Sequence, residues 1–280
     1  MSEALPCKSC GAAVNGLYCS ACGEKVLTPD DHTLKHYLGA LLNAFTFADS
    51  KLWNTLKAVV LRPGELSAAY MDGRRVKYMR PVAFFFLANF IYFAISTFDT
   101  FNTPLDTQLA MPYGEWARTQ VDEAMAKSGM DHAAFTVGYN AVSTANAKLL
   151  LVVLVFLLSL PMALLYYGKR DYLTAAVTAS FELMAFYLWT VTIGLGLFLI
   201  AVGRGLLAIG VQAEGLGTDQ FTTWPILALH VWGTLGIGRR FFLCTRAGAW
   251  WRSAVMFVAL AAALMLYRFL LFLLTFWQVS

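Results

Sequence analysis

Long apolar runs dominate the chain from residue 81 onward. A helix needs about 20 predominantly apolar residues to cross the roughly 30 Å hydrocarbon core of a bilayer. The pattern therefore predicts an all-α integral membrane protein whose transmembrane domain, residues 81–280, contains about five transmembrane helices. His230 and several glycines make the fourth helix the weakest, and Pro161 is expected to kink the second. The five predicted spans are residues 81–98, 149–167, 178–202, 224–242 and 254–277.

The composition agrees with a membrane protein. The chain of 280 residues is 59% hydrophobic and only 14% charged, which excludes disordered, collagen-like and small disulfide-rich secreted proteins. Its net charge of +4 does not indicate nucleic acid, because membrane proteins collect basic residues on their cytoplasmic side. Residues 1–25 lack the apolar core of a signal peptide, so the N-terminus is expected to stay in the cytoplasm.

The distribution of Lys and Arg predicts the orientation. With five spans and a cytoplasmic N-terminus, most of the 21 basic residues fall in inside segments, as the positive-inside rule requires. We therefore expect a multi-pass protein of the cytoplasmic (inner) membrane with its C-terminus outside. The basic residues that would face outside are Arg118, Lys127, Lys148 and Arg204.

Residues 28–80 are too polar to span a membrane and too apolar to be a linker. Apolar residues between positions 33 and 45 recur at helical spacing and form one stripe. A second helix is expected to start at residue 49 or 50 and end before Pro63, which opens a third helix that stops at an Asp72–Gly73 turn. These amphipathic juxtamembrane helices rest either on the bilayer surface or beneath the transmembrane helices. The second arrangement is favoured, because the polar faces are not strongly basic.

A basic cluster comes directly before the first predicted span. One interpretation is topogenic, since such charges hold a span in its orientation. The other is binding of anionic lipid headgroups, worth on the order of 1 kcal/mol per basic residue. Both can hold together. The cluster consists of Arg74, Arg75, Lys77 and Arg80.

The loop of residues 99–148 is predicted to face outside. It is acidic and contains no catalytic motif. A helix is expected over 115–127, and a second from about Asp131 would run directly into the second span. The loop is therefore interpreted as a small extracytoplasmic cap.

Residues 1–27 contain the strongest chemical motif, two CxxCG sequences. Four thiolates at this spacing suit tetrahedral Zn²⁺, and glycine after each pair permits the tight turn. A disulfide pair would need an oxidising compartment, and a c-type haem would need His after CxxC. With all four positions taken by thiolate the zinc would be structural, and the ribbon would dock a protein rather than nucleic acid. The predicted ligands are Cys7, Cys10, Cys19 and Cys22.

Ionisable residues within predicted spans are functional candidates because burying them in hydrocarbon is costly. Glu182 lies near the cytoplasmic end of the third span, too far from Arg268 in the fifth to pair with it. His230 and Arg268 fall at similar depths and would line an intramembrane polar pocket suited to an anion or a lipid. Alternatively, Arg268 extends to the outer surface and His230 is a neutral packing residue.

The N-terminal 85 residues resemble a bacterial membrane family known only as a domain of unknown function. The matching features are the ribbon, Pro63–Gly64, Tyr70, the GRRxKY sequence of residues 73–78, and Pro81. The five-span topology is also similar, more loosely, to that of Yip1-type membrane-trafficking proteins. The resemblance implies architecture and a membrane location, and no activity.

No motif for a nucleophile, a nucleotide or a catalytic metal is present, which favours a non-enzymatic protein without excluding an enzyme that acts on lipid. The first functional hypothesis is that the ribbon and the cytoplasmic helices recruit or organise a protein partner at the membrane. The alternative is a small transporter or channel-like protein that binds an anion or lipid at His230 and Arg268. Membrane lipid is an expected partner, and a homo-oligomer is compatible with the sequence.

Overall fold

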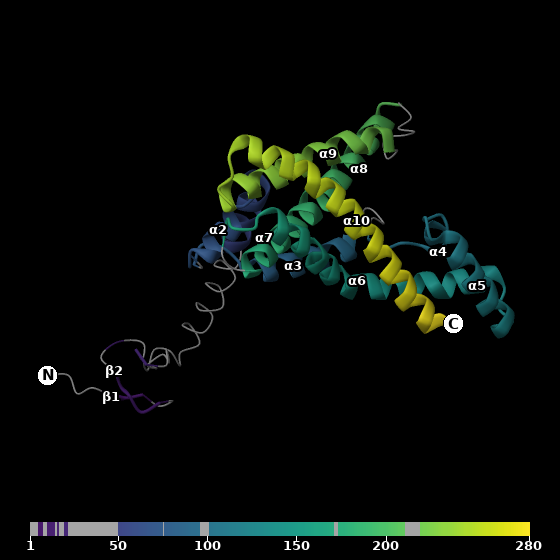
Figure 1. Ribbon diagram of the computed structural model, residues 1–280, viewed down its shortest axis with the longest axis horizontal. Coiled ribbons are helices and arrows are strands. Elements are labelled where there is room, and N and C mark those ends of the chain that lie inside the picture. Colours follow the sequence, from purple (N-terminus) through teal and green to yellow (C-terminus); the bar gives the residue numbers. More distant parts are fainter. Residues whose placement is uncertain are drawn as a thin grey trace. The chain divides into compact units, whose positions relative to one another are not determined.

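The computed structural model describes residues 5–7, 10–14, 16, 20–21, 50–74, 76–95, 101–170, 173–210 and 219–280. The chain divides into two compact units, Met1–Lys51 and Leu52–Ser280. In the first unit, strands β1 (Leu5–Pro6) and β2 (Ala13–Val14) pair antiparallel, with Leu5 opposite Val14 (Figure 1).

The described elements of the second unit are helices (Figure 1). Residues 50–61 form the first helix. The π-helix η2 (Leu188–Leu195) joins α7 to α8 without a break, and the π-helix η3 (Ile237–Phe241) extends α9. The α-helices are α2 (Glu65–Met71), α3 (Pro81–Ile95), α4 (Leu105–Leu109), α5 (Gly114–Ser128), α6 (His132–Leu165), α7 (Leu173–Tyr187), α8 (Gly196–Ala208), α9 (Asp219–Gly236) and α10 (Arg246–Val279).

Within the described residues, three helices are long and apolar enough to cross a membrane: α6, the continuous helix Leu173–Ala208, and α10. They contain the third and fifth predicted spans in full and the second up to Leu165. The first predicted span corresponds to α3, which has 15 described residues, and the fourth to α9 with η3; neither meets the same criterion. The protein is therefore helical with three candidate membrane spans, and the total of five stays a prediction.

Helix ends follow local sequence signals. Asp131 caps α6, because its side chain accepts a hydrogen bond from the backbone N–H of Ala134 at 2.8 Å. α5 ends at Gly129, which adopts a left-handed conformation with φ of 70°. The helix predicted over 115–127 is confirmed, as is the helix predicted from about Asp131, which runs through Pro161 to Leu165.

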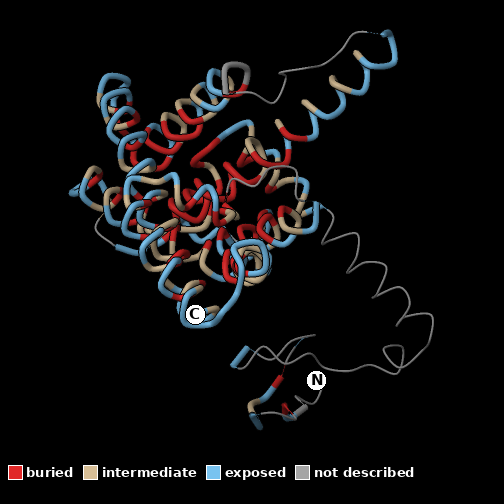
Figure 2. The backbone as a smooth tube through the Cα atoms, turned by 90° about the vertical axis from the view of Figure 1, so that its right-hand side faces the viewer, coloured by how far each residue is buried: buried red, intermediate tan, exposed pale blue. Residues whose placement is uncertain are grey.

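Helix α7 lies at the centre of the second unit. Every residue from Thr178 to Tyr187 is buried, whereas Gly196 is the one buried residue of α8. Figure 2 shows the buried backbone concentrated where the helices pack together. α7 packs against α2, α3, α6 and α9. A separate apolar cluster joins α4 and α5 to the start of α6 and the end of α10, and contains Leu105, Val121, Phe135, Tyr139 and Phe272.

Polar contacts bring distant loops together at two ends of the long helices. At one end, Arg252 near the start of α10 donates to the Leu165 carbonyl at 2.7 Å, and Arg170 donates to the Phe241 carbonyl at 3.1 Å. At the far end of α10, Asn146 donates to Gln278 at 3.0 Å. The charge pattern predicted that these segments lie on the cytoplasmic side of the membrane, and they meet near the start of α10. We call this end of the helical unit the basic end.

Residues 50–71 pack beneath the helices at the basic end. Val59, Leu66 and Ala69 are completely buried in the same apolar core as α3, α6 and α7. The described part of the juxtamembrane segment therefore packs against the helical core, and its position relative to a membrane stays a prediction. The predicted stripe at 33–45 lies outside the described residues. α2 begins at Glu65, after Gly64 as its N-cap, rather than at Pro63.

The turn at Pro63–Gly64 touches the end of α9 so closely that no side chain fits between them. Gly64 has φ of 93°, and a Cβ there would lie 2.9 Å from the Ile237 Cα atom. On the other side of the contact, a Cβ on Gly236 would lie 2.8 Å from the Pro63 carbonyl oxygen. Both glycines are therefore required by the approach of two backbones.

Replacing Gly64 with Ala should destabilise the protein more than replacing Gly73 with Ala. Both glycines have a left-handed backbone, but a Cβ on Gly73, with φ of 81°, meets nothing within 4 Å. Gly73→Ala should therefore cost about 1–2 kcal/mol of backbone strain, and Gly64→Ala should add about 1–3 kcal/mol of steric conflict. Thermal unfolding of both variants in one detergent measures the difference. Equal losses would contradict the close contact.

Candidate functional site

The carboxyl group of Glu182 is the centre of the contact between α2 and α7. Its Oε1 accepts a hydrogen bond from the Gly64 N–H at 2.7 Å, and its Oε2 accepts one from the Ser67 N–H at 2.7 Å. The first N–H groups of a helix lack partners within the helix, and the helix dipole favours a carboxylate there. Glu182 is completely buried. This acid of a candidate membrane helix is therefore the N-terminal cap of a helix more than 100 residues earlier in the chain.

The same segment is held from α9 and η3. The Trp232 Nε1–H donates to the Val60 carbonyl at 2.9 Å, and the Arg240 guanidinium donates to the Pro63 carbonyl at 3.1 Å. These carbonyls belong to the end of the 50–61 helix and the turn after it, whose oxygens lack intrahelical partners. The turn at Pro63–Gly64 is thus fixed between α7 on one side and α9 with η3 on the other.

The predicted basic cluster is partly neutralised by neighbouring acids. Arg74 forms ion pairs with Glu65 at 3.6 Å and with Asp72 at 3.3 Å, and Asp72 also pairs with Arg170 at 3.6 Å. Lys77 and Arg80 are exposed, and Arg75 lies outside the described residues. The topogenic and the lipid-binding interpretations of this cluster both stay predictions.

Both ring nitrogens of His230 have partners. Nε2 lies 3.1 Å from the Ser253 carbonyl, and Nδ1 lies 2.7 Å from the Tyr187 hydroxyl. A carbonyl only accepts, so Nε2 carries a hydrogen, and in the neutral ring Nδ1 then accepts the hydrogen of the Tyr187 hydroxyl. The nearby hydroxyls of Thr234 and Ser253 are 2.6 Å apart. His230 therefore joins α7, α9 and α10 through a buried polar network.

Arg268 lies against the cap formed by α4 and α5. Its Nη1 is 3.8 Å from the Met111 sulfur, and its backbone carbonyl accepts a hydrogen bond from Gln108 at 3.2 Å. Its buried Nε has no hydrogen-bond partner in the described part of the chain. Burial raises the pKa of Tyr113 to about 12, although the Arg268 charge acts to lower it. The described contacts of Arg268 do not include His230, and their shared pocket stays a prediction.

The first half of the predicted zinc site forms a tight hairpin turn. The Cys7 N–H donates to the Ala12 carbonyl at 2.8 Å, and the Gly11 N–H donates back to the Cys7 carbonyl at 2.9 Å. Gly11 has φ of 74°, which explains the glycine after the cysteine pair. Cys10 is exposed in this turn. The turn suits two adjacent thiolate ligands, while Cys19 and Cys22 lie outside the described residues, among which no cluster of three potential metal ligands occurs.

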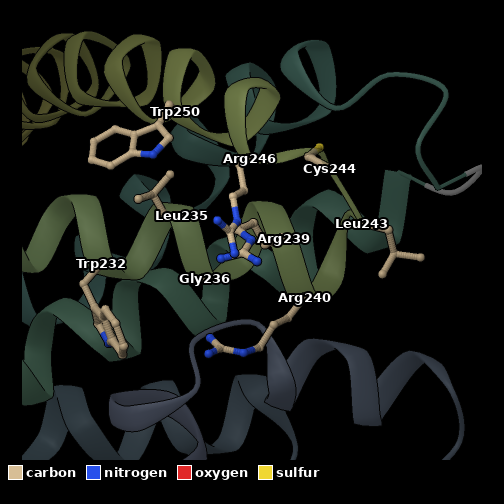
Figure 3. Close-up of a pocket in the computed structure, with 9 residues that line it drawn as sticks. All are labelled: Trp232, Leu235, Gly236, Arg239, Arg240, Leu243, Cys244, Arg246 and Trp250. Carbon is tan, nitrogen blue, oxygen red and sulfur yellow. The ribbon is translucent and has the colours of Figure 1, made fainter.

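A pocket of about 620 Å³ opens at the basic end between η3 and the start of α10 (Figure 3). Its charged lining residues are Arg239, Arg240 and Arg246, and its aromatic ones are Trp232 and Trp250. In the sequence these arginines belong to the basic residues that indicate orientation, and no motif marks them as a site. The two adjacent arginines at 239 and 240 are the feature of the sequence that could have indicated an anion site. The sequence does not show that Arg246 and the two tryptophans face them.

Residues 49–93 match a family described as Protein of unknown function (DUF3667). The match supports a family of unknown function for this chain. It covers the 50–61 helix, the Pro63–Gly64 turn, α2 and most of α3, and so includes the backbone that Glu182 and Arg240 bind. No curated protein and no solved structure matches the chain. The ribbon and the likeness to Yip1-type proteins stay predictions.

Removing the Glu182 carboxyl should release the family-matching segment from α7. Glu182→Ala leaves two buried N–H groups without acceptors, and each such group costs about 1–3 kcal/mol, so we expect a loss of about 2–6 kcal/mol. Glu182→Gln keeps one acceptor oxygen and should lose less. The exposed Glu123→Ala on α5 is the control, expected within about 0.5 kcal/mol of wild type. Unfolding in detergent gives the values, and a wild-type stability for Glu182→Ala would refute the capping role.

Proposed function

We propose that this is a non-enzymatic integral protein of the cytoplasmic membrane whose N-terminal zinc ribbon recruits or organises a protein partner. The observation that carries the proposal is the hairpin around Cys7 and Cys10, which lies in a compact unit separate from the helices. The described apolar core of this unit consists of Cys7 and Val14, with Ala12 packed against them. Such a core is too small to fold a chain unaided, and a structural metal supplies the missing stability.

Zinc bound by Cys7, Cys10, Cys19 and Cys22 would have no open coordination position. The ion would hold the ribbon in shape and would not bind substrate. A rigid small domain connected to a membrane unit is suited to docking a second protein. Residues 28–80, the cytoplasmic helices of this proposal, join the ribbon to the transmembrane unit.

The membrane placement in this proposal has five spans, with the basic end and the N-terminus in the cytoplasm and the C-terminus outside. Its support is that three arginines hold neighbouring segments together at one end of the helices. Arg240 binds the Pro63 carbonyl, Arg170 binds the Phe241 carbonyl and pairs with Asp72, and Arg252 binds the Leu165 carbonyl. Lys and Arg concentrate on the cytoplasmic side of membrane proteins. The acidic cap of α4 and α5 would then face outside.

A small transporter or channel-like protein that binds an anion or lipid is the alternative. The buried Nε of Arg268, which lacks a hydrogen-bond partner in the described part, favours it. The closed hydrogen-bond network of His230 supports the packing role instead. The recruitment proposal therefore remains the first choice.

Replacing Cys19 and Cys22 together with Ser should abolish zinc and release the partner. The matched control is Cys244→Ser, a buried cysteine of the loop before α10 in the helical unit. Native mass spectrometry of protein released gently from its own membranes reports zinc and any co-isolated chain in one spectrum. We expect about one zinc per chain in wild type and control, and none in the double variant. Full zinc retention in the double variant would refute the ribbon, and a retained partner would refute recruitment by it.

A reporter that is active only outside the cytoplasm should be active when fused after Ser280. The same reporter fused before Met1 should be inactive. This follows from five spans with a cytoplasmic N-terminus. An inactive C-terminal fusion with normal expression would mean an even number of spans, and the fourth predicted span would be removed first.

A further inference from the structure

The arginine pocket, defined by Arg239, Arg240, Arg246, Trp232, Trp250 and Leu243, has the chemistry of an anion site. In Figure 3 the side chains of Arg239 and Arg246 extend into the same space, one from η3 and the other from the first residue of α10. Arg240 points toward the Pro63 turn, where it donates its hydrogen bond. Three guanidinium groups from two helices thus surround one opening.

The positive charge of this pocket has no counter-charge in the described part of the chain. Other arginines at the same end are compensated: Arg74 pairs with Glu65 and Asp72, and Arg170 pairs with Asp72. Arg239 and Arg246 have neither an ion pair nor a hydrogen bond to a described residue, and no Asp or Glu lines the pocket. Neighbouring like charges repel each other, and a bound anion would remove that repulsion.

The backbone around the pocket departs from regular helix at two consecutive places. The last turn of α9 widens into the π-helix η3, in which the Phe242 N–H reaches the Ile237 carbonyl at 3.2 Å. Leu243 then adopts φ of 52°, a left-handed conformation that is unfavourable for a leucine. π-turns and such backbone conformations concentrate at functional sites. Together they turn the chain back into α10 and place Arg246 opposite Arg239.

The lining residues favour a ligand that is both anionic and membrane-bound. Guanidinium groups match phosphate oxygens in geometry and charge. Trp232 and Trp250 are 50% and 58% exposed, and Leu243 is 74% exposed. Tryptophans concentrate at the membrane–water interface, and α10, which begins at this pocket, is a candidate membrane span. If α10 spans the membrane, the pocket at its first residue would lie at the level where a lipid headgroup joins its acyl chains.

We propose that the arginine pocket binds the phosphate group of an anionic membrane lipid. Arg239 and Arg246 hold the phosphate, and Trp232, Trp250 and Leu243 contact the acyl chains. Its volume of about 620 Å³ is within the range of ligand sites. A soluble phosphate compound offers the same charged group without acyl chains. The proposal is independent of the zinc ribbon and of its partner.

The test measures lipid binding to the full-length protein in a neutral detergent. Native mass spectrometry follows titration with dioctanoyl phosphatidic acid, with dioctanoyl phosphatidylcholine as the zwitterionic comparison and inorganic phosphate as a competitor. The test variant is Arg239→Gln with Arg246→Gln. The control is Lys127→Gln with Arg204→Gln, which removes the same charge from exposed positions elsewhere. Arg240 stays unchanged because it also holds the Pro63 turn.

We expect wild type and control to prefer phosphatidic acid, and the test variant to bind it at least about tenfold more weakly, since charge-assisted hydrogen bonds to phosphate are strong. Arg246→Gln alone, at an exposed position, should give a smaller loss and leaves η3 intact. Competition by inorganic phosphate at similar concentrations would support the phosphate site but assign it to a soluble ligand. Unchanged binding in the test variant, or an equal loss in the control, would overturn the proposal.

Discussion

The arrangement of the helical unit depends on one buried interaction, the capping of α2 by Glu182. A carboxyl group is costly to bury, and so are unpaired N–H groups at the start of a helix. Each satisfies the other here, because Gly64 and Ser67 donate to the two oxygens. A seven-residue helix has little stability alone, so α2 keeps its position only through such contacts. The family-matching segment is therefore fixed to α7, the most buried helix of the unit.

The other contacts of this segment connect it to the arginine pocket. Arg240 lines the pocket and donates to the Pro63 carbonyl, while Trp232 lines it and donates to the Val60 carbonyl. An anion bound by Arg239 and Arg246 would thus lie directly beside the segment that matches the family of unknown function. The closeness of Gly236 to Pro63 makes this junction rigid, since neither backbone has room to shift toward the other.

The two polar residues of the predicted intramembrane pocket, His230 and Arg268, have different surroundings. Both ring nitrogens of His230 have hydrogen-bond partners, one on α7 and one on α10. His230 therefore has a packing role that connects α9 to these two helices. Arg268 instead faces the cap with a buried Nε that no described residue satisfies. In the proposed recruitment function neither residue binds the partner, which docks on the ribbon. In the lipid proposal, the lipid binds at the basic end.

The sequence by itself determined the helical class, three of its five predicted spans as long apolar helices, the helix of the cap and the start of α6 near Asp131, because length, hydropathy and helix-start signals are local properties of the chain. It also indicated which loops share an end, through the distribution of charge. Only the tertiary structure decided that Glu182 caps α2, that Tyr187 and Ser253 satisfy His230, and that Arg239 and Arg246 face one pocket. These partners lie on different helices, and periodicity encodes which face of a helix is apolar but not which neighbour it meets.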